Sequence, residues 1–300
     1  MITISTMVAV AIDGLAFGVF LALLGVGITL VFGLGEVLNL SIGVFSVIAV
    51  LIASWAMGAG QGPVVAAAIG VFVAAAIGLL VDRTLLSMVY RSTGEERILL
   101  GIFVTLGLTV FLDGFFINGL DLTWIVGGLA VPSFPGSYSI PVDLPAVSIG
   151  ITGIRRSSLV VIGVGALALA ILFAFLRLTY LGKATRTVFQ DEQGAQLVGV
   201  NPRRIRSLIF VLSVTVAGIA GVVWAVGQTF SVADGFQYTT FALIVSIVGG
   251  VRSLAGAIVA GVLLGFVNQF ANFFVGSYVA TIILFGAAIV FLLAKPEAVS

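Results

Sequence analysis

Residues 8–33 read VAVAIDGLAFGVFLALLGVGITLVFG and contain a single charged residue, Asp13. A helix needs about 20 apolar residues to cross a bilayer, and this run is long enough. The rest of the chain is similar, since 61% of its 300 residues are hydrophobic and 8% are charged. A soluble domain carries about 25% charged residues and could not bury so much apolar surface. The composition therefore predicts an all-α, polytopic transmembrane helical bundle, a single domain over residues 1–300. It excludes a soluble enzyme, a disordered chain and a partner that is a nucleic acid.

The chain has no cysteine and no histidine. This excludes disulfides, Cys/His metal sites, cysteine nucleophiles and histidine acid–base catalysis. The G-x-x-x-x-G-K-[ST] loop that holds nucleotide phosphates is also missing, because Gly182–Lys183 is followed by Ala184. We therefore expect no catalytic residue, no metal site, no cofactor bound by this chain, and no ATP hydrolysis by that route.

Nine apolar runs are separated by charged or turn residues, and they cover residues 8–33, 40–57, 63–81, 98–118, 157–179, 207–228, 238–250, 254–271 and 276–294. The seventh run is shorter than a full span and is expected to be a half-helix. The sequence thus predicts about eight full spans plus one short or re-entrant helix. Two glycine pairs, Gly14/Gly18 and Gly261/Gly265, have the small-xxx-small spacing of close helix contacts.

Most basic residues fall in two segments, 82–97 and 177–206. They are Arg83, Arg91, Arg97, Arg177, Lys183, Arg186, Arg203, Arg204 and Arg206. The positive-inside rule makes both segments cytoplasmic and the N-terminus external. We expect a multi-pass protein of the cell (inner or plasma) membrane, surrounded by membrane lipid. Residues 119–156 then form an outer loop, where the alternation at 139–144 favours a small β-hairpin.

Residues 182–206, predicted to be a cytoplasmic loop, contain the most distinctive polar pattern. Three polar residues precede three apolar ones, and these are Gln190, Asp191, Glu192, Ala195, Leu197 and Val198. Gly199 is a typical C-terminal cap, and Pro202 prevents the helix from continuing. The pattern predicts a short amphipathic helix over 187–199. It is either an ordinary solvated loop or a docking helix for a cytoplasmic partner.

This loop resembles the coupling-loop signature of the branched-chain amino acid ABC transporter permeases, R-A-x-x-Q-D/N-x-x-x-A-x-L-x-G-I/V-N. The residues that match in register are Arg186, Gln190, Asp191, Ala195, Leu197, Gly199, Val200 and Asn201. Thr187 stands where the family usually has Ala. The resemblance implies that the matching residues of this loop couple the chain to an ATPase, with the apolar side that includes Ala195 inserted into a groove.

Two further segments resemble the same family. Residues 30–43 match F-G-x-x-x-V-x-N-F-A-H-G at Phe32, Gly33, Val37, Asn39 and Gly43, whereas Leu40, Ser41 and Ile42 replace Phe, Ala and His. The loss of this His suggests a divergent member. Residues 249–257 match G-G-x-G-S-x-x-G-A, with Arg252 in place of Gly.

The pattern of residues 33–43 also indicates a function without any reference to the family. Glycines and polar residues that interrupt an apolar run are found where transporter helices break to line a cavity. Asn39, Ser41 and Gly43 are therefore predicted to line the translocation path. The alternative is that Asn39 and Ser41 hydrogen-bond between helices.

The resemblance implies a permease subunit of an ATP-driven ABC importer that moves branched-chain or related small amino acids by alternating access. It also implies a second homologous permease, two cytoplasmic ATPase subunits that carry ATP and Mg, and an extracytoplasmic substrate-binding protein.

Three alternatives stay open from the sequence. The chain could transport urea or short amides within the same family. It could be an ion-driven secondary transporter or channel, which would need a buried ionisable cluster at mid-span. An intramembrane enzyme would need His, Cys or paired acids within its spans. An acid within a membrane span usually indicates a functional site, but this inference is weaker near the interface. Asp13 and Asp113 lie towards the outer ends of their spans.

Overall fold

The computed structural model describes residues 4–35, 37–92, 94–121, 130–131, 134, 136–142, 147–149 and 152–294. In this part of the chain, six helical segments are long and apolar enough to cross a membrane. They are α1 (Ile4–Gly35), α3 (Pro63–Val81, continued by the π-helix η1 at Asp82–Leu86 and by α4 at Ser87–Val89), α5 (Glu95–Asn118), α6 (Arg156–Leu178), α9 (Pro202–Trp224) and α11 (Leu254–Val275). The prediction of a helical membrane bundle is confirmed.

Five further helices in the described residues are shorter, and they are α2 (Ile42–Gly58), α7 (Tyr180–Gln190), α8 (Glu192–Leu197), α10 (Asp234–Gly249) and α12 (Ser277–Ala294). Every apolar run of the sequence has become a helix. The count of eight full spans is not confirmed, however. The 17 residues of α2 extend over about 26 Å at 1.5 Å per residue, which is less than the hydrocarbon thickness of about 30 Å.

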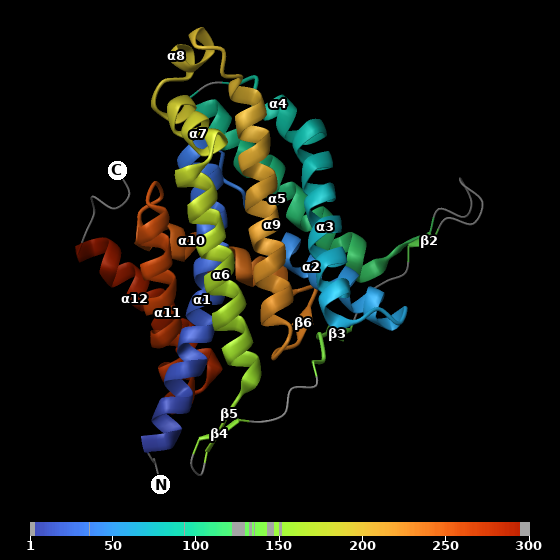
Figure 1. The fold of residues 1–300 in the computed structure, drawn as a ribbon, viewed down its shortest axis with the longest axis vertical. Helices are drawn as coiled ribbons and strands as arrows, with labels where there is room; N and C mark the ends of the chain where they lie inside the picture. The colour runs from blue at the N-terminus through green and yellow to red at the C-terminus, as the bar shows by residue number, and fades with distance from the viewer. Residues whose placement is uncertain are drawn as a thin grey trace.

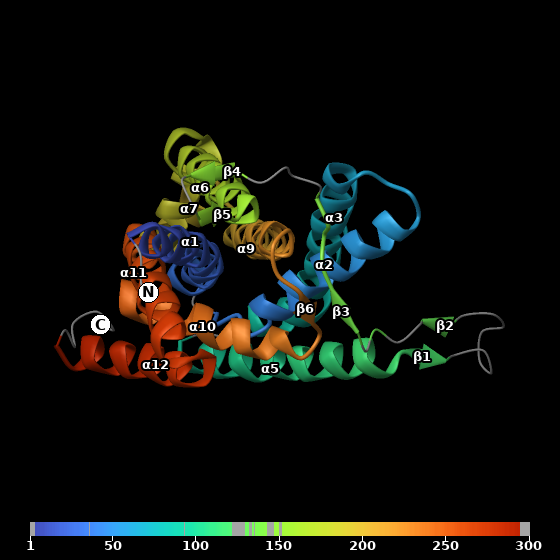
Figure 2. The ribbon, with the colours of Figure 1, turned by 90° about the horizontal axis from the view of Figure 1, so that it is seen from below.

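Helix α1 forms the centre of the bundle. Its most apolar window is 89% buried, against 28% for α3, α5, α6 and α11. Figure 2 shows α1 enclosed by α6, α9, α10 and α11. A helix that is apolar on all sides belongs in such a position. The closest partner is α11, because a Cβ on Gly18 would lie 2.7 Å from the Val262 Cα and one on Gly261 would lie 2.6 Å from the Ala22 Cα. The predicted small-residue contact is therefore confirmed.

The two ends of the bundle differ in charge and in structure. Helices α4, α7 and α8 lie at one end, and the start of α1 lies with β4 and β5 at the other (Figure 1). The two basic segments, 82–97 and 177–206, thus share one end, as the sequence predicts. We call this the basic end.

The strands are short; β3 to β6 lie towards the opposite end, and β1 and β2 project from the side of the bundle (Figure 1). Two antiparallel hairpins pair β1 (Leu120–Asp121) with β2 (Ala130–Val131), and β4 (Val147–Ile149) with β5 (Thr152–Ile154). Strand β3 (Ser137–Tyr138) pairs instead with β6 (Phe230–Ser231), which follows α9. Hairpins therefore occur in the 119–156 loop, but not over 139–144. Residues 139–142 are not in a strand, and residues 143–144 lie outside the described part.

Candidate functional site

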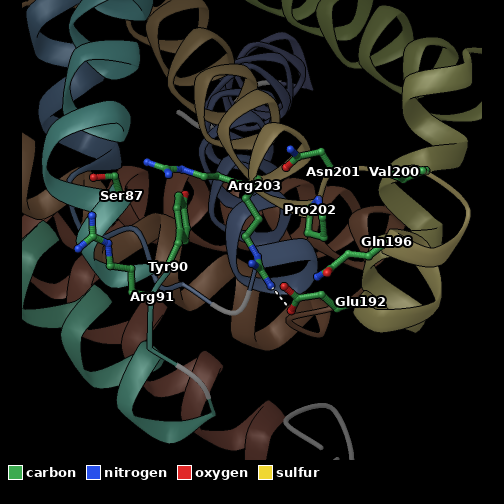
Figure 3. A pocket seen from close by; sticks show the side chains of 11 residues that line it. Ser87, Tyr90, Arg91, Glu192, Gln196, Val200, Asn201, Pro202 and Arg203 are labelled. Carbon is green, nitrogen blue, oxygen red and sulfur yellow. Dashed lines mark hydrogen bonds and ion pairs between the residues drawn. The ribbon is translucent and has the colours of Figure 1, made fainter.

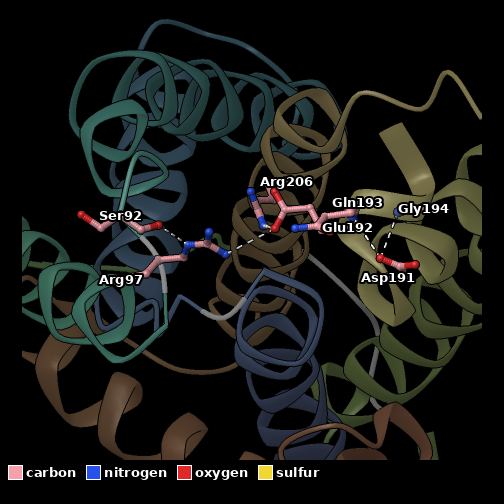
Figure 4. A network of polar contacts seen from close by, with 7 residues as sticks. All are labelled: Ser92, Arg97, Asp191, Glu192, Gln193, Gly194 and Arg206. Atoms are coloured by element: carbon pink, nitrogen blue, oxygen red, sulfur yellow. Dashed lines mark hydrogen bonds and ion pairs between the residues drawn. The ribbon is translucent and has the colours of Figure 1, made fainter. Parts of the chain in front are cut away.

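The polar segment at the basic end is built from two helices rather than from the one helix predicted over 187–199. Helix α7 ends at Gln190, and Asp191 adopts an extended backbone (φ −153°). Its Oδ1 accepts hydrogen bonds from the backbone N–H groups of Gln193 (3.0 Å) and Gly194 (2.9 Å) (Figure 4). Asp is a strong N-cap residue because it satisfies these free donors. The chain therefore breaks at Asp191 and starts again as α8.

The end of α8 follows the sequence prediction. Gly199 has φ +82°, a conformation in which a side chain is strained. The backbone N–H of Val200 donates to the Ala195 carbonyl over 2.9 Å, which closes the helix end. Asn201 then caps α9, since its Oδ1 accepts from the Arg204 N–H (3.3 Å) and Pro202 follows as the first helical residue. The short helix is thus defined at both ends.

A buried ionic cluster holds α8 against the bundle (Figure 4). The Glu192 carboxylate accepts from Arg206 Nη2 over 2.5 Å and lies 3.8 Å from Arg97 Nη1. The side chains of Arg97 and Arg206 are 6% and 8% exposed, whereas that of Glu192 is 36% exposed. Arg97 lies in the first turn of α5, and its Nε also donates to the Ser92 carbonyl. One acid on α8 is therefore bonded to two long helices.

The ionic cluster continues into the π-helix below α4. Asp82 accepts a hydrogen bond from the Tyr90 hydroxyl over 3.2 Å and another from the Ser207 hydroxyl. The Arg206 guanidinium lies 5.9 Å from the centre of the Tyr90 ring. Burial and then the nearby Asp82 carboxylate raise the pKa of Tyr90 well above its usual range, so its hydroxyl stays protonated and donates. Helices α3, α5, α8 and α9 are thus connected by polar contacts.

A cavity of about 530 Å³ opens beside this cluster (Figure 3). Ser87, Tyr90 and Arg91 line one side, and residues of α8 and the start of α9 line the other. Figure 3 shows Glu192 and Gln196 pointing into it from α8. The cavity lies between α4 and the α8 segment, and α8 contacts the bundle through the buried Ala195 as well as through Glu192.

The residues of the 182–206 loop that match the family signature differ in exposure. Arg186, Gln190 and Asp191 are exposed, whereas Ala195 is fully buried within this chain. Ala195 therefore packs within this chain, and the coupling role of the matching residues stays a prediction. Leu197 and Val198 are 89% and 71% exposed and form the apolar surface of this segment.

Residues 249–257, which also match the family, lie at the basic end as well. Arg252, in the turn between α10 and α11, lies 5.8 Å from the centre of the Phe189 ring on α7. The residue that departs from the family pattern thus makes a cation–π contact with the helix before the break.

The residues predicted to line a path are enclosed in the bundle. Asn39 and Ser41 are fully buried, and Asn39 Oδ1 accepts from both the backbone N–H (3.0 Å) and the hydroxyl (2.7 Å) of Ser41. The Gly43 N–H donates to the Thr239 hydroxyl of α10 over 2.9 Å, and a Cβ on Gly43 would collide with the Gly235 carbonyl. Within this structure the three residues hold the turn before α2 and its contact with α10.

Sequence reasoning did not assign a role to the residues of the ionic cluster. It used Arg97 and Arg206 only to predict the topology, and Glu192 only as one of the polar residues of the predicted helix. The available signal is that Glu192 is an acid within a strongly basic segment. Its partners could not be named, because they lie on two helices far apart in the sequence.

Known proteins resemble this chain over most of its length. Residues 10–293 match the family described as "Branched-chain amino acid transport system / permease component". The high-affinity branched-chain amino acid transport system permease protein LivH of Escherichia coli K12 is 26% identical, over 96% of this chain and 93% of LivH. BraD of Pseudomonas aeruginosa PAO1, another high-affinity branched-chain permease protein, is also 26% identical, over 96% of this chain and 94% of BraD. LivM of Escherichia coli K12 is 33% identical over 100 residues, which are 33% of this chain and 23% of LivM.

Proposed function

Because the chain belongs to the family of branched-chain amino acid transport system permease components, we propose that it is the membrane permease subunit of an ATP-driven importer. Its substrates are branched-chain or related small amino acids, which it moves by alternating access. The basic end faces the cytoplasm and the N-terminus faces outwards, in accordance with the positive-inside rule.

The main support for this proposal is the structure of α8. It is a short helix, capped at both ends, that presents the exposed side chains of Leu197 and Val198 at the basic end. Exposed apolar residues at the tip of a capped helix are suited to a groove on a partner protein. We assign this groove to a cytoplasmic ATPase subunit that carries the ATP and Mg, because this chain lacks a phosphate-binding loop.

The ionic cluster gives the ATPase a mechanical connection to the membrane helices. When the partner moves α8, Glu192 moves with it and pulls on Arg97 of α5 and Arg206 of α9. Both helices are long and apolar enough to span the membrane. Closure of the ATPases on ATP is thus transmitted to the part of the chain that opens and closes the path, where Asn39, Ser41 and Gly43 hold the base of α2.

The proposed assembly contains a second permease and a binding protein. The relatives LivH and LivM are both permease proteins of branched-chain amino acid transport systems of one organism. This supports a pair of homologous permeases, of which this chain is one. An extracytoplasmic substrate-binding protein delivers the amino acid to the end opposite α8.

Co-purification tests the role of α8. The chain is expressed with the ATPase subunits of its transporter, and the Leu197→Asp variant is compared with Gln193→Ala. Leu197→Asp places a charge in the apolar contact and should abolish co-purification. Gln193 is exposed on the same helix, and its replacement should leave the yield of ATPase unchanged. Normal ATPase recovery with Leu197→Asp would contradict the assignment.

A further inference from the structure

A second cavity lies at the end of the bundle opposite α8. It has a volume of about 460 Å³, within the range of about 300–1,000 Å³ that is typical of small-molecule sites. Its walls come from α1, α6, α11 and the residues that follow α9. None of the family motifs described above contributes to it.

The polar side chains of this cavity form an unusual set. Asp13 is its acid and Arg155 its base, and three carboxamide groups of α11 line it as well, from Asn268, Gln269 and Asn272. Asp13 Oδ1 accepts a hydrogen bond from the Ser158 hydroxyl over 2.5 Å. Among the described residues, Asp13 and Arg155 form no ion pair with each other or with any other group. The cavity thus contains one carboxylate and one guanidinium that have no ion-pair partner in the described part of the chain.

The deeper wall of the cavity is apolar and closely packed. Phe17 lies one helical turn below Asp13 on α1, about 6 Å further along the axis at 1.5 Å per residue. Its ring centre is 5.3 Å from that of Trp224, which in turn stacks on Phe20 at 5.1 Å. Val161 of α6 completes this wall and is 2% exposed.

We propose that this cavity binds the zwitterion of a small aliphatic amino acid. The ammonium group donates to the Asp13 carboxylate, and Arg155 with the carboxamides of α11 receives the carboxylate. The aliphatic side chain then lies against Phe17, Val161 and Trp224. In the proposed orientation this is the outer end, so the cavity is where an amino acid released by the binding protein first contacts the permease. The inference rests on the proposed function.

The ethanolamine phosphate headgroup of a lipid carries the same two charges. The test therefore uses two membranes. The full-length chain is placed in nanodiscs of phosphatidylcholine alone or with phosphatidylethanolamine, and binding of radiolabelled L-leucine is measured. Saturable binding should be equal in both membranes. Binding that is lost in phosphatidylethanolamine discs, or that is displaced by phosphoethanolamine, would assign the cavity to the lipid and overturn the proposal.

Two variants and one matched control test whether the charges of Asp13 and Arg155 are needed for leucine binding. Asp13→Asn keeps the acceptor for Ser158 but removes the charge, and it should weaken leucine binding at least about tenfold. Asp113→Asn removes the acid that lies towards the same end on α5, outside this cavity, and should bind as wild type does. Arg155 is exposed, so Arg155→Gln is expected to fold. This variant should no longer prefer leucine over leucinamide, which lacks the carboxylate.

The outcomes separate this inference from the proposed function. An absence of saturable leucine binding by the wild-type chain, or equal binding by Asp13→Asn, overturns the site even if the ATPases co-purify. Failure of the wild-type chain to recruit any ATPase contradicts the proposed function, whatever the result for leucine.

Discussion

Replacement of Glu192 by Gln should detach α8 from the bundle without unfolding the spans. The carboxylate is the charged partner of the Arg206 guanidinium, whose side chain is 8% exposed. The glutamine side chain keeps the size of the original one but leaves this buried cation without an ion-pair partner among the described residues. Removal of one partner from a buried pair costs about 3–5 kcal/mol, whereas exposed pairs contribute about 0–1 kcal/mol. Because the Glu192 side chain is 36% exposed, we expect a value between these limits.

A loss of about 2 kcal/mol corresponds to a factor of about 30 in the opening equilibrium of α8. Hydrogen exchange measures it directly, through the amides of Ala195 and Val200, which bond to the carbonyls of Asp191 and Ala195. Peptides that cover residues 191–200 should exchange about 30-fold faster in Glu192→Gln than in wild type. Gln193→Ala is the control and should exchange as wild type. An increase below about threefold in Glu192→Gln would show that the ionic cluster does not hold α8.

Three further predictions concern packing, topology and pH. Gly265→Ala places a methyl group against the α1 backbone and should lower the free energy of unfolding by about 1–3 kcal/mol, as measured by thermal unfolding. The control is Gly163→Ala, whose methyl group would face open space and should change stability little. The chain has no cysteine, so single cysteines can be labelled without background: one at Gln193 should react only from the cytoplasm and one at Ser137 only from outside. Burial and Asp82 raise the pKa of Tyr90 above its ordinary value of 10.0, so the unfolded chain loses this proton at a lower pH than the folded chain does. The free energy of unfolding should therefore fall as pH rises from about 9 to about 11. In urea unfolding, Tyr90→Phe should make this fall with pH less steep.

The helices could be predicted from the sequence because lipid imposes a simple rule on backbone groups. Every polar backbone group in the hydrocarbon must bond within its own segment, so a long apolar run becomes a helix. All nine runs follow this rule, and the glycines at positions 18, 261 and 265 correctly indicated close helix contacts, although not which helices are in contact. The number of full spans could not be fixed in this way. Helix length depends on where each end is capped, and α2 and α12 fall at the limit.

The site could be predicted only as far as local rules extend. Gly199 and Pro202 gave the end of α8 because a positive φ and a missing N–H act on their own segment. The break at Asp191 was missed, since an Asp within a polar run fits either a helix or a cap. The burial of Ala195 was also missed, because it depends on tertiary contacts that the pattern of apolar residues does not specify. The ionic cluster of Glu192, Arg97 and Arg206 could not be predicted for the same reason.

In the proposed mechanism, ATP hydrolysis by partner subunits drives import through movements of α8. The most direct measurement is leucine uptake per ATP hydrolysed, in proteoliposomes that contain this chain, its partner permease, the ATPases and the binding protein. Wild type should accumulate leucine only with ATP. Gly199→Val strains the left-handed cap of α8 (φ +82°) and should lower the ratio of leucine to ATP, while Gln193→Ala should not. Leucine uptake driven by an ion gradient without ATP, or an unchanged ratio in Gly199→Val, would contradict the account.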